Sequence, residues 1–227
     1  MMNKNIFVAC DLSTHKEVIN ILEKIQNDIY GIKIGLQYIT QRSPDDIREL
    51  SKFKKPIFYD GKFFDIKNTL ISSIQALSTL KISFATVHLL NGLDALKSAN
   101  QVANKINVRL LGVSVLTSFS DNDLENLGFK NKVENQVEKL VKIASEANLY
   151  GVVCSPLEIK IVKKIAPQLK CFTPGIRMNS NNKEDDQKRT MNANEATKAG
   201  SDFLIIGRPI LEGDPKKNID QIISSIK

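Results

Sequence analysis

The sequence predicts a (β/α)8 barrel, an α/β fold, built as a single domain over residues 1–227. Two observations predict this fold. Short, nearly continuous apolar runs recur along the chain, as buried parallel strands require, and segments with helical spacing of apolar residues separate them. Eight such runs in somewhat over 200 residues fit the barrel. A doubly wound sheet is the alternative, although it usually needs fewer strands and a recognisable switch point.

The predicted strands follow one another along the whole chain. They are residues 5–11 (NIFVACD), 30–35 (YGIKIG), 56–62 (PIFYDGK), 84–90 (FATVHLL), 108–116 (VRLLGVSVL), 150–155 (YGVVCS), 169–175 (LKCFTPG) and 202–208 (DFLIIGR). Residues 14–29 and 131–148 place their apolar side chains on one helical face, and therefore predict two of the intervening helices. Residues 177–194 are polar and predict a long loop, which in a compact domain is usually functional and often a lid.

Composition favours a soluble globular protein, because 42% of the residues are hydrophobic and 25% are charged. A net charge of +7 would suit an anionic partner, but the lysines are dispersed and form no basic stripe, so we expect no nucleic-acid binding. Cys10, Cys154 and Cys171 lack metal-type spacing and predict buried free thiols in a reducing compartment. We see no signal peptide and no stretch of membrane-spanning length, and expect a cytoplasmic protein without membrane contact.

Charged residues stand directly after the apolar run PIFY. Active sites of (β/α)8 barrels lie at the carboxyl ends of the strands, and residues i and i+2 of a strand face the same side. Asp60 and Lys62 are therefore predicted to point together into the barrel mouth, with Lys33 as a further member of the cluster. Asp65 follows the strand, where capping of the next helix is the simpler role. Other polar groups at strand ends are Asp11, His88, Thr117 and Ser155.

The ends of the last two predicted strands favour a phosphate site. TPGIR (173–177) and IGRPI (206–210) stand where barrels commonly bind phosphate. Gly175 and Gly207 allow close backbone approach, and an arginine can pair bidentately with phosphate oxygens. Each feature alone is also typical of an ordinary surface turn, but the two together, joined by a long polar loop, predict a phosphate-binding end of the site.

The segment DGKFFDIKNT (60–69) resembles the D-x-K-x-x-D-I segment of the orotidine 5'-phosphate decarboxylase family. VACDL, KIGLQ, TVHLLNG, VSVLTS, TPGIR and DDQKRTMNANEATKAGSDFLIIGRPI occur in the family's order over nearly the whole chain. D-x-K-x-x-D alone is shared with sugar-phosphate decarboxylases and aldolases of the same superfamily, whereas its combination with PGIR, DQKR and IGRPI is specific. The resemblance implies an enzyme that converts orotidine 5'-monophosphate to uridine 5'-monophosphate and CO₂ in de novo pyrimidine biosynthesis, without metal or cofactor.

The resemblance also implies roles for individual residues. Lys62 would be the proton donor, Asp60 would lie beside the substrate carboxylate, and Lys33 would hold Asp60 and a ribose hydroxyl. The remaining implied substrate contacts are Asp11 at the ribose, Thr117 at the pyrimidine, and Pro174, Arg177, Gln187, Gly207 and Arg208 at the phosphate end and its loop. Asp65, Ile66 and Thr69 would reach the neighbouring subunit's site, which implies a homodimer with shared active sites.

Elementary chemistry favours the same roles. Loss of CO₂ leaves a carbanion in the plane of the pyrimidine ring, where the ring π-system cannot delocalise it. We find no cofactor motif that would supply an electron sink. A fixed ammonium that faces the developing charge and can protonate it is the remaining means of stabilisation, and Lys62 fits that role.

Several positions depart from the family's usual pattern, among them Gly61, Phe64, Lys67 and Asp186. Asp186 adds an acid near the implied phosphate, and Lys67 would offset it only if the two approach each other.

Two other functions are compatible with a basic barrel. A magnesium-dependent sugar-phosphate decarboxylase or aldolase would need a metal-binding group at the end of the second strand, where Lys33 stands, and would lose activity with a chelator. A non-enzymatic protein that binds phosphorylated ligands or RNA would show salt-sensitive affinity for nucleic acid.

Overall fold

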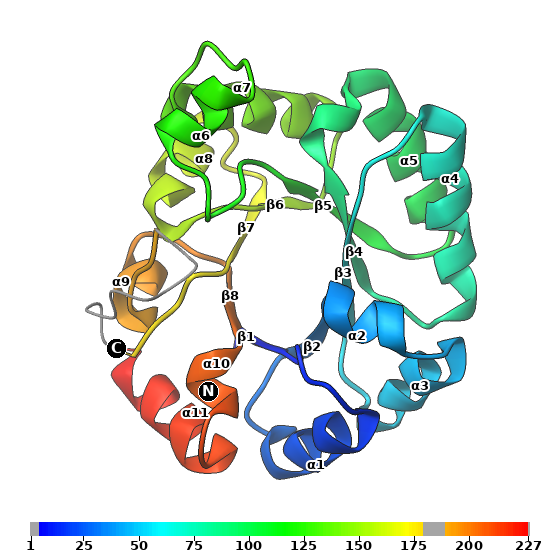
Figure 1. Ribbon diagram of the computed structural model, residues 1–227, viewed down its shortest axis with the longest axis vertical. Helices are drawn as coiled ribbons and strands as arrows, with labels where there is room; N and C mark the ends of the chain where they lie inside the picture. The colour runs from blue at the N-terminus through cyan, green and yellow to red at the C-terminus, as the bar shows by residue number, and fades with distance from the viewer. Residues whose placement is uncertain (1–4, 179–188, 227) are drawn as a thin grey trace.

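The computed structural model describes residues 5–178 and 189–226, which form a closed parallel barrel surrounded by helices (Figure 1). Neighbouring strands pair in chain order, and β1 also pairs with β8. The strands are β1 Ile6–Ala9, β2 Gly31–Ile34, β3 Ile57–Phe63, β4 Phe84–His88, β5 Arg109–Val113, β6 Gly151–Val153, β7 Lys170–Thr173 and β8 Phe203–Ile206. The predicted single-domain (β/α)8 barrel is confirmed, and the doubly wound alternative is wrong because the sheet closes on itself.

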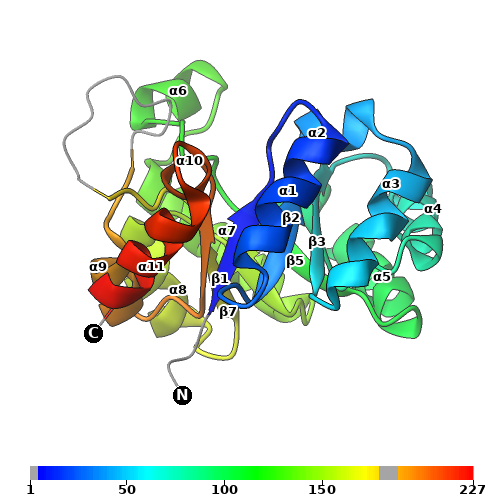
Figure 2. The same ribbon diagram turned by 90° about the horizontal axis from the view of Figure 1, so that it is seen from below.

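Helices connect successive strands and surround the barrel in Figure 1, and Figure 2 shows the same helices and strands from the side. The α-helices are α1 His15–Ile25, α2 Leu36–Gln41, α3 Pro44–Glu49, α4 Lys67–Ala76, α5 Leu93–Lys105, α6 Asp121–Asn126, α7 Val133–Glu146, α8 Ile159–Ile165, α9 Ala193–Lys198, α10 Arg208–Leu211 and α11 Pro215–Ser225. Short 3₁₀ segments are η1 Leu50–Phe53, η2 Leu77–Thr79, η3 Leu89–Asn91 and η4 Pro156–Glu158. Helix α11 packs beside α1, so the last helix of the ring meets the first.

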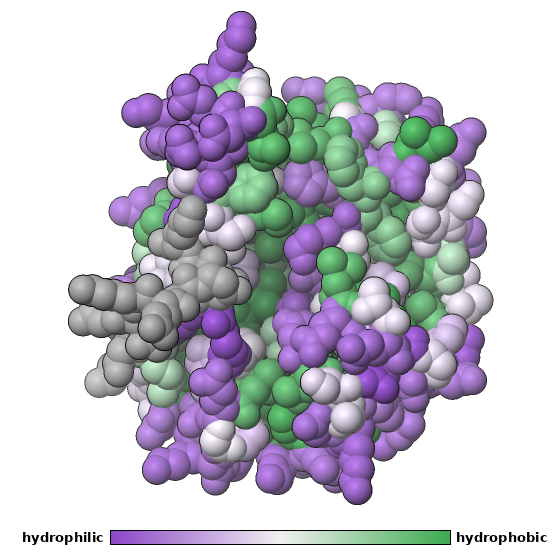
Figure 3. All heavy atoms as spheres, viewed as in Figure 1, coloured by the Kyte–Doolittle hydropathy of each residue, from purple (hydrophilic) through white to green (hydrophobic). Residues whose placement is uncertain are grey.

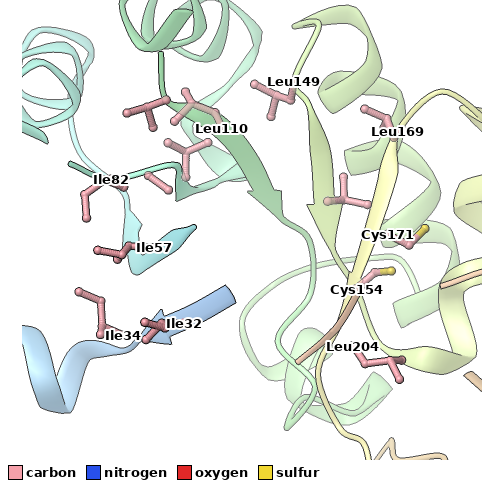
Figure 4. Close-up of a cluster of buried hydrophobic side chains, with 14 of the residues drawn as sticks. Ile32, Ile34, Ile57, Ile82, Leu110, Leu149, Cys154, Leu169, Cys171 and Leu204 are labelled. Carbon is pink, nitrogen blue, oxygen red and sulfur yellow. The ribbon is translucent and has the colours of Figure 1, made fainter. Parts of the chain in front are cut away.

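The larger part of the core lies between the strands and the helices. The amphipathic patterns predicted for residues 14–29 and 131–148 are confirmed, since Val18, Leu22 and Ile25 of α1 and Val137 and Val141 of α7 are buried. Cys154, directly after β6, and Cys171, on the adjacent β7, lie in this layer (Figure 4). All three cysteines are free and buried, as predicted, and burial raises the pKa of Cys10 to about 12.

The barrel interior holds a separate aromatic core. The ring of Phe7 lies within 5.7 Å of four other phenylalanine rings, measured between ring centroids; these are Phe58, Phe84, Phe172 and Phe203. Gly31 allows this packing, because a Cβ there would lie 2.3 Å from the Phe7 ring. Since strand residues alternate between the two faces, positions two residues further along also face inward, toward the barrel mouth. The aromatic core therefore lies directly beneath the inward-facing residues at the barrel mouth.

Candidate active site

A cavity of about 540 Å³ opens at the carboxyl ends of the strands. On the face viewed in Figure 3, a central hollow shows apolar atoms with hydrophilic side chains beside them. Nine of the predicted site residues line the cavity: Asp11, Lys33, Asp60, Lys62, Thr117, Pro174, Arg177, Gly207 and Arg208. The structure thus brings together residues that are far apart in the sequence, at the end of the barrel where this fold carries its active sites.

Four of these residues form a continuous chain of alternating charge across β1, β2 and β3. The Nζ of Lys33 lies 3.2 Å from Oδ2 of Asp11 and 3.4 Å from Oδ2 of Asp60. The Nζ of Lys62 lies 3.0 Å from that same Asp60 oxygen. We call Asp11, Lys33, Asp60 and Lys62 the charged cluster. The prediction that Asp60 and Lys62 point together and that Lys33 joins them is confirmed.

Burial and charge act in opposite directions on the two central members of the charged cluster. Burial by itself lowers the pKa of Lys33, yet the carboxylates of Asp60 and Asp11 raise that pKa above its ordinary value. Burial by itself raises the pKa of Asp60, but Lys33 and Lys62 outweigh this effect and hold that pKa below its ordinary value. Both residues therefore stay charged near neutral pH, although Lys33 is only 6% exposed and Asp60 only 9% exposed.

Lys62 differs from its neighbours in its backbone and in its exposure. Its φ angle is 48°, in the left-handed region that residues other than glycine rarely adopt. The pairing of β3 with β4 is irregular between Tyr59 and Phe63, so Lys62 lies within a bulge of the strand. Its side chain is 33% exposed, in contrast to that of Lys33. The Lys62 ammonium is thus accessible from the cavity while it remains paired with Asp60.

A further part of the cavity wall comes from the ends of β7 and β8. Pro174, Gly175 and Arg177 follow β7, and Gly207 and Arg208 follow β8. Gly175 has a φ of 79°, a conformation that favours glycine. Two arginines on this wall face the cavity that the charged cluster also lines, so the cavity is suited to a ligand with an anionic end.

Three predicted site residues lie outside the cavity of this chain. Asp65, Ile66 and Thr69 are exposed on the segment after β3 and at the start of α4. Asp65 is not the cap of that helix: the N-cap residue is Ile66, and the Asp65 carboxylate accepts a hydrogen bond from the Ile66 N–H at 2.7 Å.

Gln187 and Asp186 lie outside the described residues. Lys67 pairs with Asp94 at 2.8 Å, so its carboxylate partner here is on α5.

His88, at the end of β4, supports the local structure. Its Nδ1 accepts a hydrogen bond from the Leu90 N–H at 3.3 Å, and burial together with the nearby Lys62 ammonium lowers its pKa. A neutral ring suits this acceptor role. These contacts give His88 a structural role at the barrel mouth.

Two groups of residues were not predicted as part of the site. Thr86 bonds to both Asp60 and Lys62 from the middle of β4. Arg189 forms an ion pair with buried Glu158 and donates hydrogen bonds to the carbonyls of Val115 and Leu116, which line the cavity. Alternation along β4 could have identified Thr86, since it stands two residues after Phe84. We see no sequence signal that pairs Arg189 with Glu158.

Among the described residues, no group of three or more histidines, cysteines, aspartates or glutamates is placed to hold a metal ion. Within the same residues, no helix combines the length and the apolar character that crossing a membrane requires.

The closed parallel barrel and the charged cavity at its mouth are those of a (β/α)8-barrel enzyme. The family model described as "Orotidine 5'-phosphate decarboxylase / HUMPS family" matches residues 4–222, and the chain belongs to this family. Orotidine 5'-phosphate decarboxylases from Wolbachia pipientis and Lawsonia intracellularis are each 36% identical to it, and each alignment covers 97% of this chain and 98% of the relative.

Solved structures agree with this assignment. The crystal structure of orotidine 5'-phosphate decarboxylase from Lactobacillus acidophilus has a TM-score of 0.84 and 32% sequence identity, and the match covers 98% of each chain. An uncharacterized conserved protein from Geobacillus kaustophilus has the same TM-score at 22% identity, which supports the fold alone. The resemblance found in the sequence is therefore confirmed at the level of the family.

Proposed function

We propose that this protein decarboxylates orotidine 5'-monophosphate to uridine 5'-monophosphate and CO₂, as a step of de novo pyrimidine biosynthesis and without metal or cofactor. The observation that supports this most strongly is the charged cluster, in which the accessible Lys62 ammonium lies 3.0 Å from the carboxylate of Asp60 at the barrel mouth. The family and the named relatives support the same reaction.

In the proposed reaction the bond between C6 and the carboxylate carbon breaks, and its electron pair stays on C6 while CO₂ leaves. The Lys62 ammonium stabilises this charge and then transfers a proton to C6. Neutral Lys62 recovers its proton from water after product formation. The Asp60 carboxylate would lie beside the departing carboxylate, and Lys33 would keep Asp60 in place through their 3.4 Å ion pair.

The other cavity residues would bind the rest of the nucleotide. Asp11 would accept a hydrogen bond from a ribose hydroxyl, and Thr117 would contact the pyrimidine edge. Pro174, Arg177, Gln187, Gly207 and Arg208 would hold the phosphate end. Binding energy from the phosphate would order the site around the reacting carbon, so that remote contacts contribute to the rate.

We further propose that the enzyme is a cytoplasmic homodimer with shared active sites. Phe64 is 62% exposed and Ile66 is 75% exposed on either side of Asp65, an unusual density of exposed apolar surface beside a charge. A second copy of the chain would cover these side chains, and Asp65, Ile66 and Thr69 would then contact its active site.

The reaction is tested by incubating purified protein with orotidine 5'-monophosphate, with and without EDTA, while the ultraviolet absorbance of the orotate chromophore is followed. Conversion to uridine 5'-monophosphate that EDTA leaves unchanged is expected. Folded protein that gives no conversion would contradict the proposal. Conversion that EDTA abolishes would contradict its metal-free mechanism and favour the magnesium-dependent chemistry.

The shared site is tested by complementation between two inactive variants. In a mixed dimer of Lys62→Ala and Asp65→Ala, one site combines an intact Lys62 with the intact Asp65 of the other chain. After unfolding and refolding together, the mixture should regain about a quarter of wild-type activity, because half of the dimers are mixed and each has one good site. Without regained activity in a dimeric mixture, Asp65 would act within its own chain.

A further inference from the structure

Thr86 lies behind the charged cluster and connects two of its members. It occupies the middle of β4, is fully buried, and faces the barrel interior between Phe84 and His88. Its hydroxyl donates a hydrogen bond to Oδ1 of Asp60 at 3.0 Å and accepts one from the backbone N–H of Lys62 at 2.8 Å. These directions are fixed, since a carboxylate only accepts and a backbone N–H only donates.

These contacts complete a closed ring of hydrogen bonds. The Lys62 N–H binds Thr86, Thr86 binds Oδ1 of Asp60, and Oδ2 of Asp60 binds the Lys62 ammonium. Lys62 is therefore held at both ends, its backbone through the threonine and its side chain through the aspartate. With Oδ1 fixed by Thr86, the second oxygen of Asp60 is directed at Lys33 and Lys62 together.

The backbone of Lys62 is the reason that such support matters. The residue is in the left-handed region within a strand bulge, where regular pairing between β3 and β4 is interrupted. A strained conformation persists only where its surroundings hold it in place. In a regular strand the Lys62 N–H would donate to a carbonyl of the neighbouring strand, whereas here it donates to the Thr86 hydroxyl. This hydrogen bond stabilises the bulge that directs the Lys62 ammonium toward the cavity.

We propose that Thr86 is a positioning residue for the decarboxylation, which sets the direction of the Lys62 ammonium through the backbone of Lys62 and the carboxylate of Asp60. Thr86 does not line the cavity, so it acts on the substrate only through these two residues. This inference rests on the proposed function. It adds a residue on a fourth strand, β4, to the charged cluster that spans β1 to β3.

The test compares Thr86→Val, which replaces the hydroxyl by a methyl group of similar size, with Thr86→Ser, which keeps the hydroxyl. For Thr86→Val we expect kcat to fall about 10²-fold with KM changed little, because misplacement of a reacting group by about 1 Å has that effect. Thr86→Ser should stay close to wild type. Thr79→Val is the matched control, since Thr79 is exposed and its hydroxyl donates a hydrogen bond to the carbonyl of Ala76, away from the charged cluster.

Two further readouts separate positioning from general loss of structure. Loss of the Thr86 donor should raise the pKa of Asp60, so the acid limb of the kcat profile should move to higher pH in Thr86→Val and not in Thr79→Val. A crystal structure of Thr86→Val should show a changed Lys62 φ or a lengthened contact between Lys62 and Asp60. If Thr86→Val does not fold, Thr86→Ala serves as the second variant without a hydroxyl.

Wild-type kcat in a hydroxyl-free variant, or an equal loss in Thr86→Ser, would overturn the inference. Inactive wild-type protein would instead contradict the proposed function. In that case the crystal structure still tests the effect of Thr86 on Lys62, and an unchanged Lys62 backbone in Thr86→Val would overturn the inference.

Discussion

The ammonium of Lys62 lies 3.0 Å from Oδ2 of Asp60, two residues earlier on the same strand. That oxygen also receives the ammonium of Lys33 at 3.4 Å. One carboxylate oxygen thus holds two cations in place, and the charged cluster of two acids and two lysines is neutral as a whole. The arrangement keeps a cation exposed at the cavity without leaving a buried charge unpaired.

Removal of the Lys62 ammonium should abolish decarboxylation. Lys62→Ala is expected to lower kcat by about 10³-fold or more, since the variant would lose both the proposed proton donor and the charge proposed to stabilise the carbanion. Loss of orotate absorbance measures the rate, and circular dichroism checks the fold. Lys142→Ala is the control, because Lys142 is exposed on α7. Substantial residual turnover in Lys62→Ala would show that another group protonates the product.

The charged cluster should make stability depend on pH in a defined window. Folding lowers the pKa of Asp60. Its contribution to the free energy of unfolding is therefore fully present above the unfolded-state pKa of about 3.9 and is lost as the pH falls through the folded-state pKa. Folding raises the pKa of Lys33. Its contribution to the free energy of unfolding is therefore fully present below the unfolded-state pKa of about 10.4 and is lost as the pH rises through the folded-state pKa.

Asp60→Asn should therefore destabilise the protein most between about pH 4 and pH 10, by about 3–5 kcal/mol, because it leaves buried Lys33 with only one carboxylate partner. Urea unfolding of wild type and variant across this pH range gives the difference. A difference that stays constant down to pH 2 would mean that the Asp60 charge contributes nothing.

Arg208 should recognise phosphate. Arg208→Ala is expected to weaken binding of uridine 5'-monophosphate about 10- to 100-fold, since hydrogen bonds to charged groups contribute about 1.5–3 kcal/mol. Binding of uridine, which lacks the phosphate, should change little. Calorimetric titration of both ligands makes the comparison, with Arg109→Ala as the control because Arg109 is at the opposite end of the barrel, over the Tyr150 ring. Equal losses for both ligands would place Arg208 away from the phosphate.

Gly35 should be intolerant of any side chain. A Cβ at this position would lie 2.3 Å from Oδ1 of Asp11 and 3.1 Å from Nζ of Lys33. Gly35→Ala is therefore expected to displace Asp11 and to lower kcat/KM about 10- to 100-fold, because small displacements at a reacting site are costly. The melting temperature should change much less than it does in Asp60→Asn. Wild-type kcat/KM in a folded variant would show that Asp11 can move without consequence.

The aromatic core inside the barrel should contribute strongly to stability. Phe172 is fully buried and its ring contacts those of Phe7 and Phe203. Phe172→Ala should lower the free energy of unfolding by about 3–5 kcal/mol, through lost burial and the cavity that remains. Urea denaturation measures this, and Leu157→Ala, at a position 57% exposed, is the control. A loss below about 1 kcal/mol would mean that the barrel interior collapses around the missing ring.

Sequence patterns predicted most of the fold and much of the site. The strands were found because a strand covered on both faces is apolar along its whole length. Asp60 and Lys62 were found because charges at the carboxyl end of such a strand fall where a barrel carries its active site. Lys33 was placed with them because the second and third strands are neighbours in the predicted barrel. Asp11 was predicted at a strand end, and its contact with Lys33 is a finding of the structure.

Other features depend on contacts that no local pattern encodes. Alternation along β4 could place Thr86 on the inner face of the barrel, but its contacts with Asp60 and Lys62 depend on the irregular pairing of β3 with β4. Arg189 and Glu158 are separated by 31 residues and meet only through tertiary structure. The pairing of Lys67 with Asp94 likewise required the packing of α4 beside α5. The roles of Asp65, Ile66 and Thr69 depend on a second chain and stay predictions.

The phenylalanine-filled interior has a consequence for the movement of molecules during turnover. Four phenylalanine rings fill the barrel beneath the cavity: Phe7, Phe58, Phe84 and Phe172. The cavity opens at the carboxyl ends of the strands, and we expect substrate and products to enter and leave there. Nucleotide would enter by that opening, and CO₂ released near Lys62 would leave by it as well. Both products would then leave through the same opening. CO₂, a small neutral molecule, would leave first, while the nucleotide is still held by its phosphate.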